Sequence, residues 1–142
     1  MKIGIIGGGK VGCCLAEYLQ NHLVGITAST STKNQELADR FHTSYTATLE
    51  VIEQAEVIFL TLPDRKIMTL ANEIASATKV AVKIFLHCSG SLGLEPLQAL
   101  HEQGAHCGSM HPLQSFAGGA TKLQGVYMAV DGDDLAQAKA KE

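Results

Sequence analysis

Apolar and polar residues follow two different periods along this chain of 142 residues. Short runs that are almost wholly apolar and rich in Val and Ile are typical of strands buried on both faces. Between them lie segments in which apolar residues recur every three or four positions, as in amphipathic helices. The predicted strands are residues 2–6, 23–28, 57–62, 80–87, 105–110 and 126–130, with a further short strand at 43–46.

Helices are predicted between these strands. In the first of them, Val11, Cys14, Leu15, Tyr18 and Leu19 share one face at spacings of three and four. Strands that alternate with helices predict a doubly wound α/β fold, with a mostly parallel sheet and helices on both of its faces. The helices are expected at about 11–19, 33–41, 48–54, 64–77 and 94–103, and a last one begins at 133–134.

Length and composition narrow the class of protein. We expect one domain over residues 1–142, whose last helix contains a single large apolar residue, Leu135, as if trimmed from a longer protein. A net charge of −3 without a basic face argues against nucleic acid as a partner, and the apolar runs are too short to span a membrane. The four cysteines form no C-x-x-C pair, so we interpret them as thiols of a cytoplasmic protein.

A glycine-rich turn follows the first predicted strand directly. Gly7, Gly9 and Gly12 fit the spacing G-x-G-x-x-G at the point where strand gives way to helix. Gly7 permits the tight turn, Gly9 lets a pyrophosphate approach the backbone, and Gly12 lets the helix pack close to the sheet. These glycines, with Lys10 and Val11, predict a dinucleotide site at a helix N-terminus, although a turn without a ligand would show the same spacing.

The end of the second predicted strand bears on which dinucleotide binds. NAD-binding domains usually place an acidic residue there, whereas this chain has Ser29, Thr30, Ser31, Thr32 and Lys33. Hydroxyls and a lysine suit the 2′-phosphate of NADP, so NADP is predicted and NAD is less favoured. The alternative is that Ser31 or Thr32 only caps a helix and that Lys33 is a solvated surface residue.

Polar residues also follow the later strands, where open α/β sheets bind their ligands. Leu62, Pro63 and Asp64 stand at or just after the end of the strand 57–62 and are predicted to contact the cofactor, the first two as a wall beside the nicotinamide. Histidine titrates near neutral pH and can move the proton that accompanies hydride transfer. The predicted catalytic residues are His111, Ser89 and Ser91. A purely structural role for His111 stays open.

A metal site is the rival interpretation of the two His-Cys pairs, His87-Cys88 and His106-Cys107. Each pair offers one ligand, because adjacent residues of a strand point to opposite faces. A third ligand would have to come from His111. The spacing matches no known ligand pattern, so no metal is predicted.

Taken together, four motifs resemble a known group of proteins. They are Gly7-x-Gly9-x-x-Gly12, Thr61-Leu62-Pro63-Asp64, His87-Cys88-Ser89-Gly90 and the segment from Gly108 to Phe116. The chain resembles bacterial Rossmann-like proteins that carry a C-terminal domain of unknown function, within the 6-phosphogluconate-dehydrogenase-like superfamily. The resemblance implies an NADP-binding Rossmann domain followed by a helical domain, missing here, that makes a homodimer and closes the substrate site.

Prephenate dehydrogenases of that superfamily carry a similar glycine–histidine–proline segment. By that resemblance the substrate-facing histidine is His111, and the assisting serine is Ser89 or Ser91. A glycine-rich turn is replaced here by residues 113–116, so prephenate itself is not predicted. The expected function is hydride transfer between NADP(H) and a small polar metabolite, with His111 as general acid or base. The alternative is a nucleotide-binding or sensor module without turnover.

Overall fold

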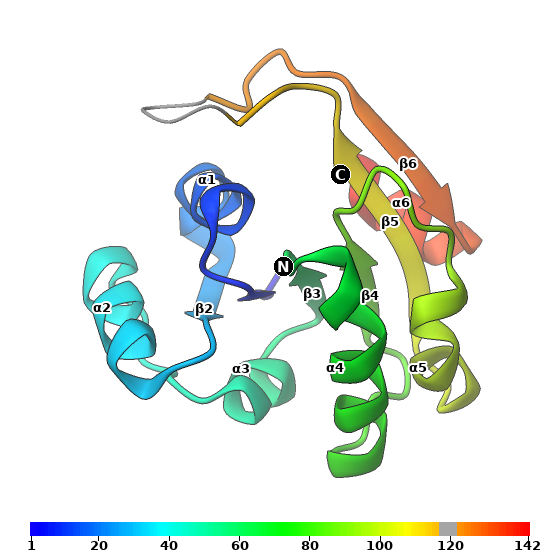
Figure 1. The fold of residues 1–142 in the computed structure, drawn as a ribbon, viewed down its shortest axis with the longest axis horizontal. Coiled ribbons are helices and arrows are strands. Elements are labelled where there is room, and N and C mark those ends of the chain that lie inside the picture. The colour runs from blue at the N-terminus through cyan, green and yellow to red at the C-terminus, as the bar shows by residue number, and fades with distance from the viewer. Residues whose placement is uncertain (117–121) are drawn as a thin grey trace.

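The computed structural model describes residues 1–116 and 122–142, which form a six-stranded sheet between two layers of helices (Figure 1). The strand order is β2-β1-β3-β4-β5-β6, in which the first five strands are parallel and β6 is antiparallel to β5. The predicted doubly wound, mostly parallel α/β fold is therefore confirmed. The strands are β1 Ile3–Ile6, β2 Leu23–Thr27, β3 Val57–Leu60, β4 Ile84–His87, β5 His106–Pro112 and β6 Met128–Gly132.

The two helical layers follow from the alternation of side chains along each strand. In β1, Ile3 and Ile5 pack in the core beneath α1, α2 and α6, whereas Ile6 packs in the core formed with α3, α4 and α5. Both faces of the sheet are therefore buried. The helices are α1 Lys10–Tyr18, α2 Ser31–Phe41, α3 Thr48–Gln54, α4 Asp64–Ala77, α5 Gln98–Glu102 and α6 Asp134–Lys141, with 3₁₀ turns at Gln20–His22 and Glu95–Leu97.

The strand predicted at residues 43–46 is wrong. This segment is irregular and joins α2 to α3. It crosses the face of β2 instead of pairing with its edge: the carbonyl oxygen of Tyr45 lies 3.3 Å from where a Cβ on Gly25 would be. Tyr45 packs against the hydrophobic core of that face. A strand paired with the exposed edge of β2 would not bury it in this way.

The strand predicted at residues 80–87 begins later than expected, at Ile84. Residues 81 and 82 form a turn in which Val82 has a φ of 60°, and its N–H donates to the carbonyl of Gly104. A positive φ ends extended structure, so the apolar run is longer than the strand. Tyr18, predicted to share a face with Leu15, is 62% exposed, whereas Leu15 is 1% exposed.

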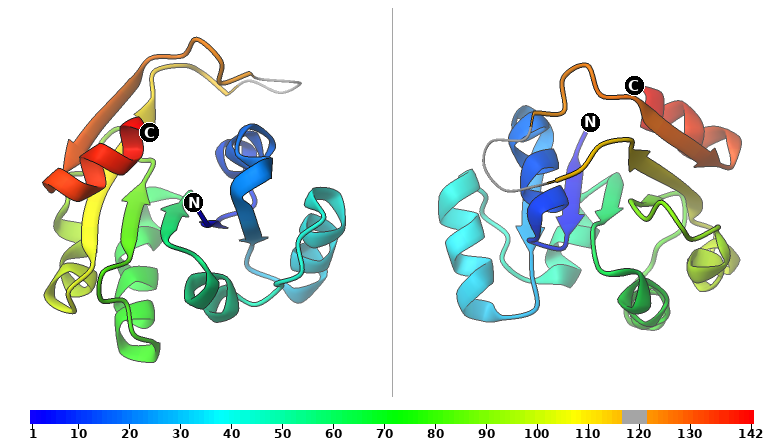
Figure 2. Two further views of the ribbon diagram at one scale, coloured as in Figure 1. Left: turned by 180° about the vertical axis from the view of Figure 1, so that it is seen from behind. Right: turned by 45° about the horizontal axis from the view of Figure 1, so that its top comes forward.

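Strands β5 and β6 continue beyond the sheet as two arms that reach across to α1 (Figure 2). The N–H of Leu113 still donates to the carbonyl of Tyr127, so the pairing extends past the last residue of β5. The stretch between the predicted strands 105–110 and 126–130 lies partly outside the described residues. Among the helices that the structure describes, none is long and apolar enough to cross a membrane.

Candidate functional site

The carboxyl ends of the parallel strands lie along one side of the sheet, which we call the polar edge. It comprises the glycine turn after β1, the loop after β3 that begins at Thr61, the loop 88–93 after β4, and His111 near the end of β5. These four segments come from distant parts of the sequence, and the parallel topology brings them together. This edge is where open α/β sheets bind their ligands.

The glycine turn has no room for side chains on its inner side. Gly7 has a φ of +126°, a conformation that favours glycine. A Cβ on Gly12 would lie 1.9 Å from the carbonyl oxygen of Gly7, so at this point the backbones of α1 and the turn are in direct contact. A Cβ on Gly9, by contrast, would meet nothing within 4 Å, so this position opens outward. Gly9 is the N-cap of α1 and provides no side-chain cap, which leaves the N-terminal N–H groups available to a ligand.

Thr61 holds this turn in place, a role that the sequence interpretation missed. Its hydroxyl donates to the carbonyl of Gly7 over 2.7 Å and lies 3.3 Å from that of Ile6. It thereby ties the end of β3 to the end of β1. The residue type gave a signal, because Thr61 interrupts an otherwise apolar run at the end of its strand.

At the end of β2, the helix cap is Thr30, not Ser31 or Thr32. The Oγ1 of Thr30 accepts from the backbone N–H of Lys33 over 3.2 Å. Ser29 and Ser31 are exposed, and so are the neighbouring hydroxyls. The ammonium of Lys33 lies 3.6 Å from the carboxylate of Glu36, a solvated ion pair that contributes little stability.

A cavity of about 340 Å³ connects the glycine turn, the end of β2 and helix α4. Gly7 and Ser29 line one side of it, and Leu62 lines another. The remaining wall is one face of α4, with residues at spacings of three and four that the sequence interpretation did not select. These residues are Lys66, Thr69, Leu70 and Glu73.

Asp64 belongs to a hydrogen-bonded cluster with the two predicted serines. The hydroxyl of Ser91 donates to Oδ2 of Asp64 over 2.6 Å. Hydrogen bonds from Ser91 and Ser89 lower the pKa of Asp64, and the nearby His87 and His111 contribute further. Ser89 Oγ in turn accepts from the backbone N–H groups of Ser91 and Leu92, each over 3.2 Å. The structure thus brings Asp64, predicted beside the cofactor, together with the predicted catalytic serines.

His111 faces this cluster from β5. Its Nδ1 lies 3.1 Å from the carbonyl oxygen of Cys88. Because a carbonyl only accepts, Nδ1 carries the proton in this hydrogen bond. The other ring nitrogen, Nε2, has no hydrogen-bond partner among the described residues. Every buried side-chain nitrogen of these residues does have a partner, so Nε2 is not buried. Nε2 is therefore open to solvent or to a substrate.

His87 has a structural position. It is fully buried, its Nε2 donates to the carbonyl of Gly93 over 2.8 Å, and its Nδ1 accepts from the N–H of Ser89 over 3.2 Å. His106 pairs with Asp133 at 3.3 Å, away from the loop after β4. Within residues 1–116 and 122–142, no group of three or more His, Cys, Asp or Glu side chains is placed to hold a metal ion.

The cysteines of the two His-Cys pairs are poor nucleophiles. Burial raises the pKa of the Cys88 thiol to about 12. Burial, with the charge of Asp133, raises that of Cys107 to about 12 as well. Both are therefore neutral thiols near pH 7, without the thiolate character that catalysis or metal binding requires.

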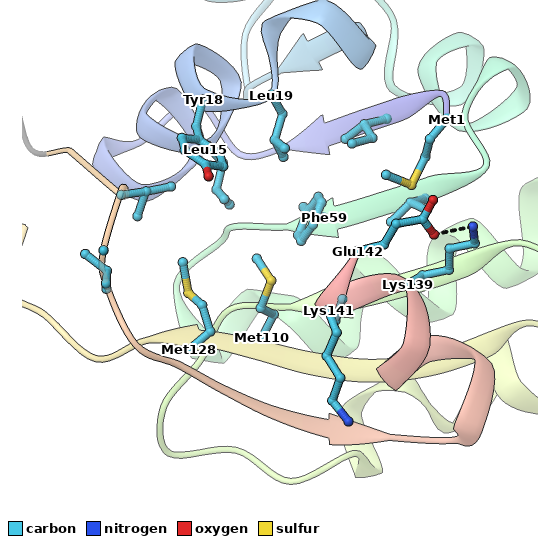
Figure 3. A pocket seen from close by; sticks show the side chains of 16 residues that line it. Met1, Leu15, Tyr18, Leu19, Phe59, Met110, Met128, Lys139, Lys141 and Glu142 are labelled. Carbon is cyan, nitrogen blue, oxygen red and sulfur yellow. Dashed lines mark hydrogen bonds and ion pairs between the residues drawn. The ribbon is translucent and has the colours of Figure 1, made fainter.

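A second hollow, which we call the apolar pocket, lies between α1 and α6 over β1 and β3 (Figure 3). Its volume is about 270 Å³. Leu15, Phe59, Met110 and Met128 point into it, and the ion pair between Lys139 and Glu142 lies at its rim. None of the predicted site residues lines this pocket.

Comparison with known proteins agrees with this geometry. The sequence model of the Rossmann-like domain matches residues 1–112. No curated protein sequence matches the chain significantly.

Three solved structures illustrate the shared fold. An imine reductase from Bacillus cereus is 17% identical, with a TM-score of 0.76 over 99% of this chain and 50% of that one. The 3-hydroxyisobutyrate dehydrogenase of Mycobacterium tuberculosis is 17% identical, with a TM-score of 0.76 over 99% of this chain and 49% of that one. An imine reductase from Aspergillus terreus, in complex with NADPH4, is 16% identical, with a TM-score of 0.65 over 81% of this chain and 42% of that one. The chain thus spans about half the length of these proteins or less.

Proposed function

The chain belongs to the Rossmann-like domain family, and from this we propose that it binds NADP(H) at the polar edge as the cofactor domain of an oxidoreductase. The observation that carries the proposal is the glycine turn. Gly12 and Gly7 meet through backbone with no space for a Cβ, while Gly9 opens outward at the N-terminus of α1. A pyrophosphate suits this arrangement, because it needs close backbone approach and favours the positive end of a helix. Gly7, Gly9, Lys10, Val11 and Gly12 are the residues assigned to it.

The cavity beside α4 suits the adenosine half of the cofactor. Leu62 and Leu70 offer apolar walls, and the open end of the cavity reaches Ser29. The end of β2 carries the exposed hydroxyls of Ser29, Thr30 and Ser31, followed by Lys33. No carboxylate stands at the end of β2 to repel a 2′-phosphate, although Glu36 follows one turn further on. A reductive aminase from Aspergillus terreus that shares the fold was solved in complex with NADPH, which supports the same preference.

The nicotinamide half is assigned to the loops after β3 and β4. Leu62 and Pro63 form its wall, and the cluster of Asp64, Ser89 and Ser91 lies beyond them with His111. The bound cofactor supplies the hydride chemistry. The residues of this chain orient the substrate: Ser89 and Ser91 hydrogen-bond its polar group, and His111 gives or takes the proton at Nε2. The substrate class is a small polar metabolite with a carbonyl, imine, hydroxyl or amine.

Calorimetric titration tests the cofactor assignment. We expect the wild-type protein to bind NADPH more tightly than NADH. Gly9→Ala adds a methyl group where the pyrophosphate would lie and is expected to weaken NADPH binding at least tenfold, or about 1.4 kcal/mol. Gly104→Ala, in the turn before β5 and at the opposite end of the sheet, is the control and should bind as the wild type does. Failure of the wild-type protein to bind either dinucleotide would overturn the proposal.

A nucleotide-binding module without turnover is the second candidate, and His111→Ala separates the two. Both candidates predict unchanged affinity for NADPH in this variant, because His111 is assigned to the substrate. Only the oxidoreductase predicts that wild-type protein oxidises NADPH with some member of a panel of imines and small carbonyl compounds, and that the variant loses this activity. A wild-type protein that binds NADPH and turns over none of them favours the module.

A further inference from the structure

The ring of His111 rests on the loop that follows β4. A Cβ on Gly90 would lie 2.5 Å from Nε2, 2.7 Å from Cε1 and 2.9 Å from Cδ2 of His111. Real Cβ atoms essentially never approach other atoms so closely. The ring therefore occupies the space that any side chain at position 90 would need.

Besides the bond between His111 and Cys88, hydrogen bonds within the loop and from His87 hold it in shape. His87 lies beneath it, fully buried, and its ring joins the N–H of Ser89 to the carbonyl of Gly93. On the other side, the hydroxyl of Ser89 accepts the N–H groups of Ser91 and Leu92. The loop is thus pinned at its start, middle and end, and its backbone offers His111 a preformed surface.

The same loop sets the tautomer of His111. The carbonyl of Cys88 accepts from Nδ1, so in the neutral ring the lone pair is on Nε2. A ring pushed off Gly90 would lose that carbonyl, and either tautomer would then be available. The contact with Gly90 and the hydrogen bond to Cys88 therefore both determine which ring nitrogen of His111 is basic and where it lies.

We propose that residues 87–93 form a socket in which Gly90 and His87 are positioning residues that fix Nε2 of His111 as the nitrogen exchanging a proton with the substrate. The position and tautomer of the ring stand on the contacts above. The exchange rests on the proposed function. In the oxidising direction, bound NADP⁺ would accept the hydride from the substrate carbon, and Nε2 would accept the proton of the substrate hydroxyl or amine, making the imidazolium. Reduction is the reverse.

A double-mutant cycle tests the socket without any knowledge of the substrate. Gly90→Ala is expected to lower the midpoint of thermal unfolding by about 3 °C or more, because the new methyl group displaces the His111 ring. In a His111→Ala background the space is vacant, so the same substitution should lower it by much less. Gly93→Ala is the control: its methyl group would meet only the movable carboxylate of Glu95, and its effect should be the same in both backgrounds.

The tautomer gives a second readout that general destabilisation would not change. In ¹⁵N-labelled wild-type protein, long-range proton–nitrogen spectra of the neutral ring should show His111 protonated at Nδ1 and bare at Nε2. The signal is assigned by its loss in His111→Ala. Gly90→Ala should shift His111 toward a mixture of tautomers, while Gly93→Ala leaves it as in the wild type.

Two results would overturn the socket. One is an equal effect of Gly90→Ala with and without the His111 ring, and the other is an unchanged tautomer in Gly90→Ala. If Gly90→Ala is too unstable for spectroscopy, recovery of folding in the double variant still decides the matter. The titration with NADPH does not depend on the unfolding measurements or on the tautomer spectra. Failure of NADPH binding and failure of the socket are therefore distinguishable.

Discussion

The polar edge and the apolar pocket lie on the same sheet, but different kinds of contact hold their residues in place. At the polar edge, backbone atoms and short hydrogen bonds determine each position: Thr61 holds Gly7, Ser91 holds Asp64 and Cys88 holds His111. In the apolar pocket, the flexible side chains of Met110 and Met128 form part of the wall, and the ion pair between Lys139 and Glu142 lies at the rim. Methionine is flexible and fills space in many ways.

This difference teaches where chemical specificity is located in the molecule. A group held by directional hydrogen bonds has one productive position, whereas a wall of flexible apolar side chains accepts several. Enzymes need reacting groups held to a fraction of an ångström. The polar edge therefore has the construction that a reactive site requires, and the comparison predicts that it tolerates substitutions least.

The largest effect is expected from Gly12→Ala. The new methyl group would lie 1.9 Å from the carbonyl oxygen of Gly7, and α1 would have to move off the sheet. We expect a loss of about 3 kcal/mol in the free energy of unfolding, measured by urea denaturation. Gly9→Ala is the matched control and should lose less than about 1 kcal/mol, since nothing lies near its methyl group. Equal losses in the two variants would contradict the backbone contact.

A smaller, pH-dependent effect is expected at Asp133, which caps α6 beside the apolar pocket. Burial alone would raise the pKa of this carboxyl, but the N–H groups of Ala136 and Cys107, with His106, bring it below its usual value. A lowered pKa stabilises the fold above the ordinary value of about 3.9 and ceases to do so as the pH falls through the folded value. Asp133→Ala should therefore lose about 1–2 kcal/mol at pH 7.

The same urea titrations at lower pH complete this measurement. As the pH falls through the lowered folded pKa of Asp133, wild type and Asp133→Ala should approach each other, because the wild-type carboxyl becomes protonated. Affinity for NADPH at pH 7 should stay unchanged, since α6 does not form the polar edge. A difference that grows on acidification would have the wrong sign for this cap.

The smallest effect is expected from Met110→Leu in the apolar pocket. Met110 is 7% exposed, and leucine has a similar volume without polar atoms. We expect a loss of less than about 1 kcal/mol and unchanged NADPH affinity. A larger loss than for Gly12→Ala would reverse the comparison between the two regions.

Local patterns predicted most of the fold. Strand β1 and helix α1 could be recognised because their periods and the glycines between them agree. The segment 43–46 could not, because its irregular path depends on Tyr45 packing above Gly25, a contact across the fold. The late start of β4 likewise depends on Val82, whose N–H reaches Gly104.

Candidate site residues were predictable by type and by their place after strands, but not by partner. Ser91 and His111 were selected from the sequence, whereas the link from Ser91 to Asp64 spans 27 positions and needed the structure. The face of α4 that carries Lys66 was overlooked, because its polar residues have the ordinary pattern of a solvated helix surface. The bond from Thr61 to Gly7 spans 54 positions, so it too could not be predicted from the local sequence.

The glycine turn has a consequence for how this protein can evolve. Its contribution to a ligand comes from main-chain atoms, which are identical in every residue type, so drift in neighbouring side chains leaves it intact. The loop after β4 and the end of β5 contribute through imidazole and hydroxyl groups, which a single codon change can replace. Under the proposed function, descendants of this chain would therefore change substrate by altering the second set while inheriting the first.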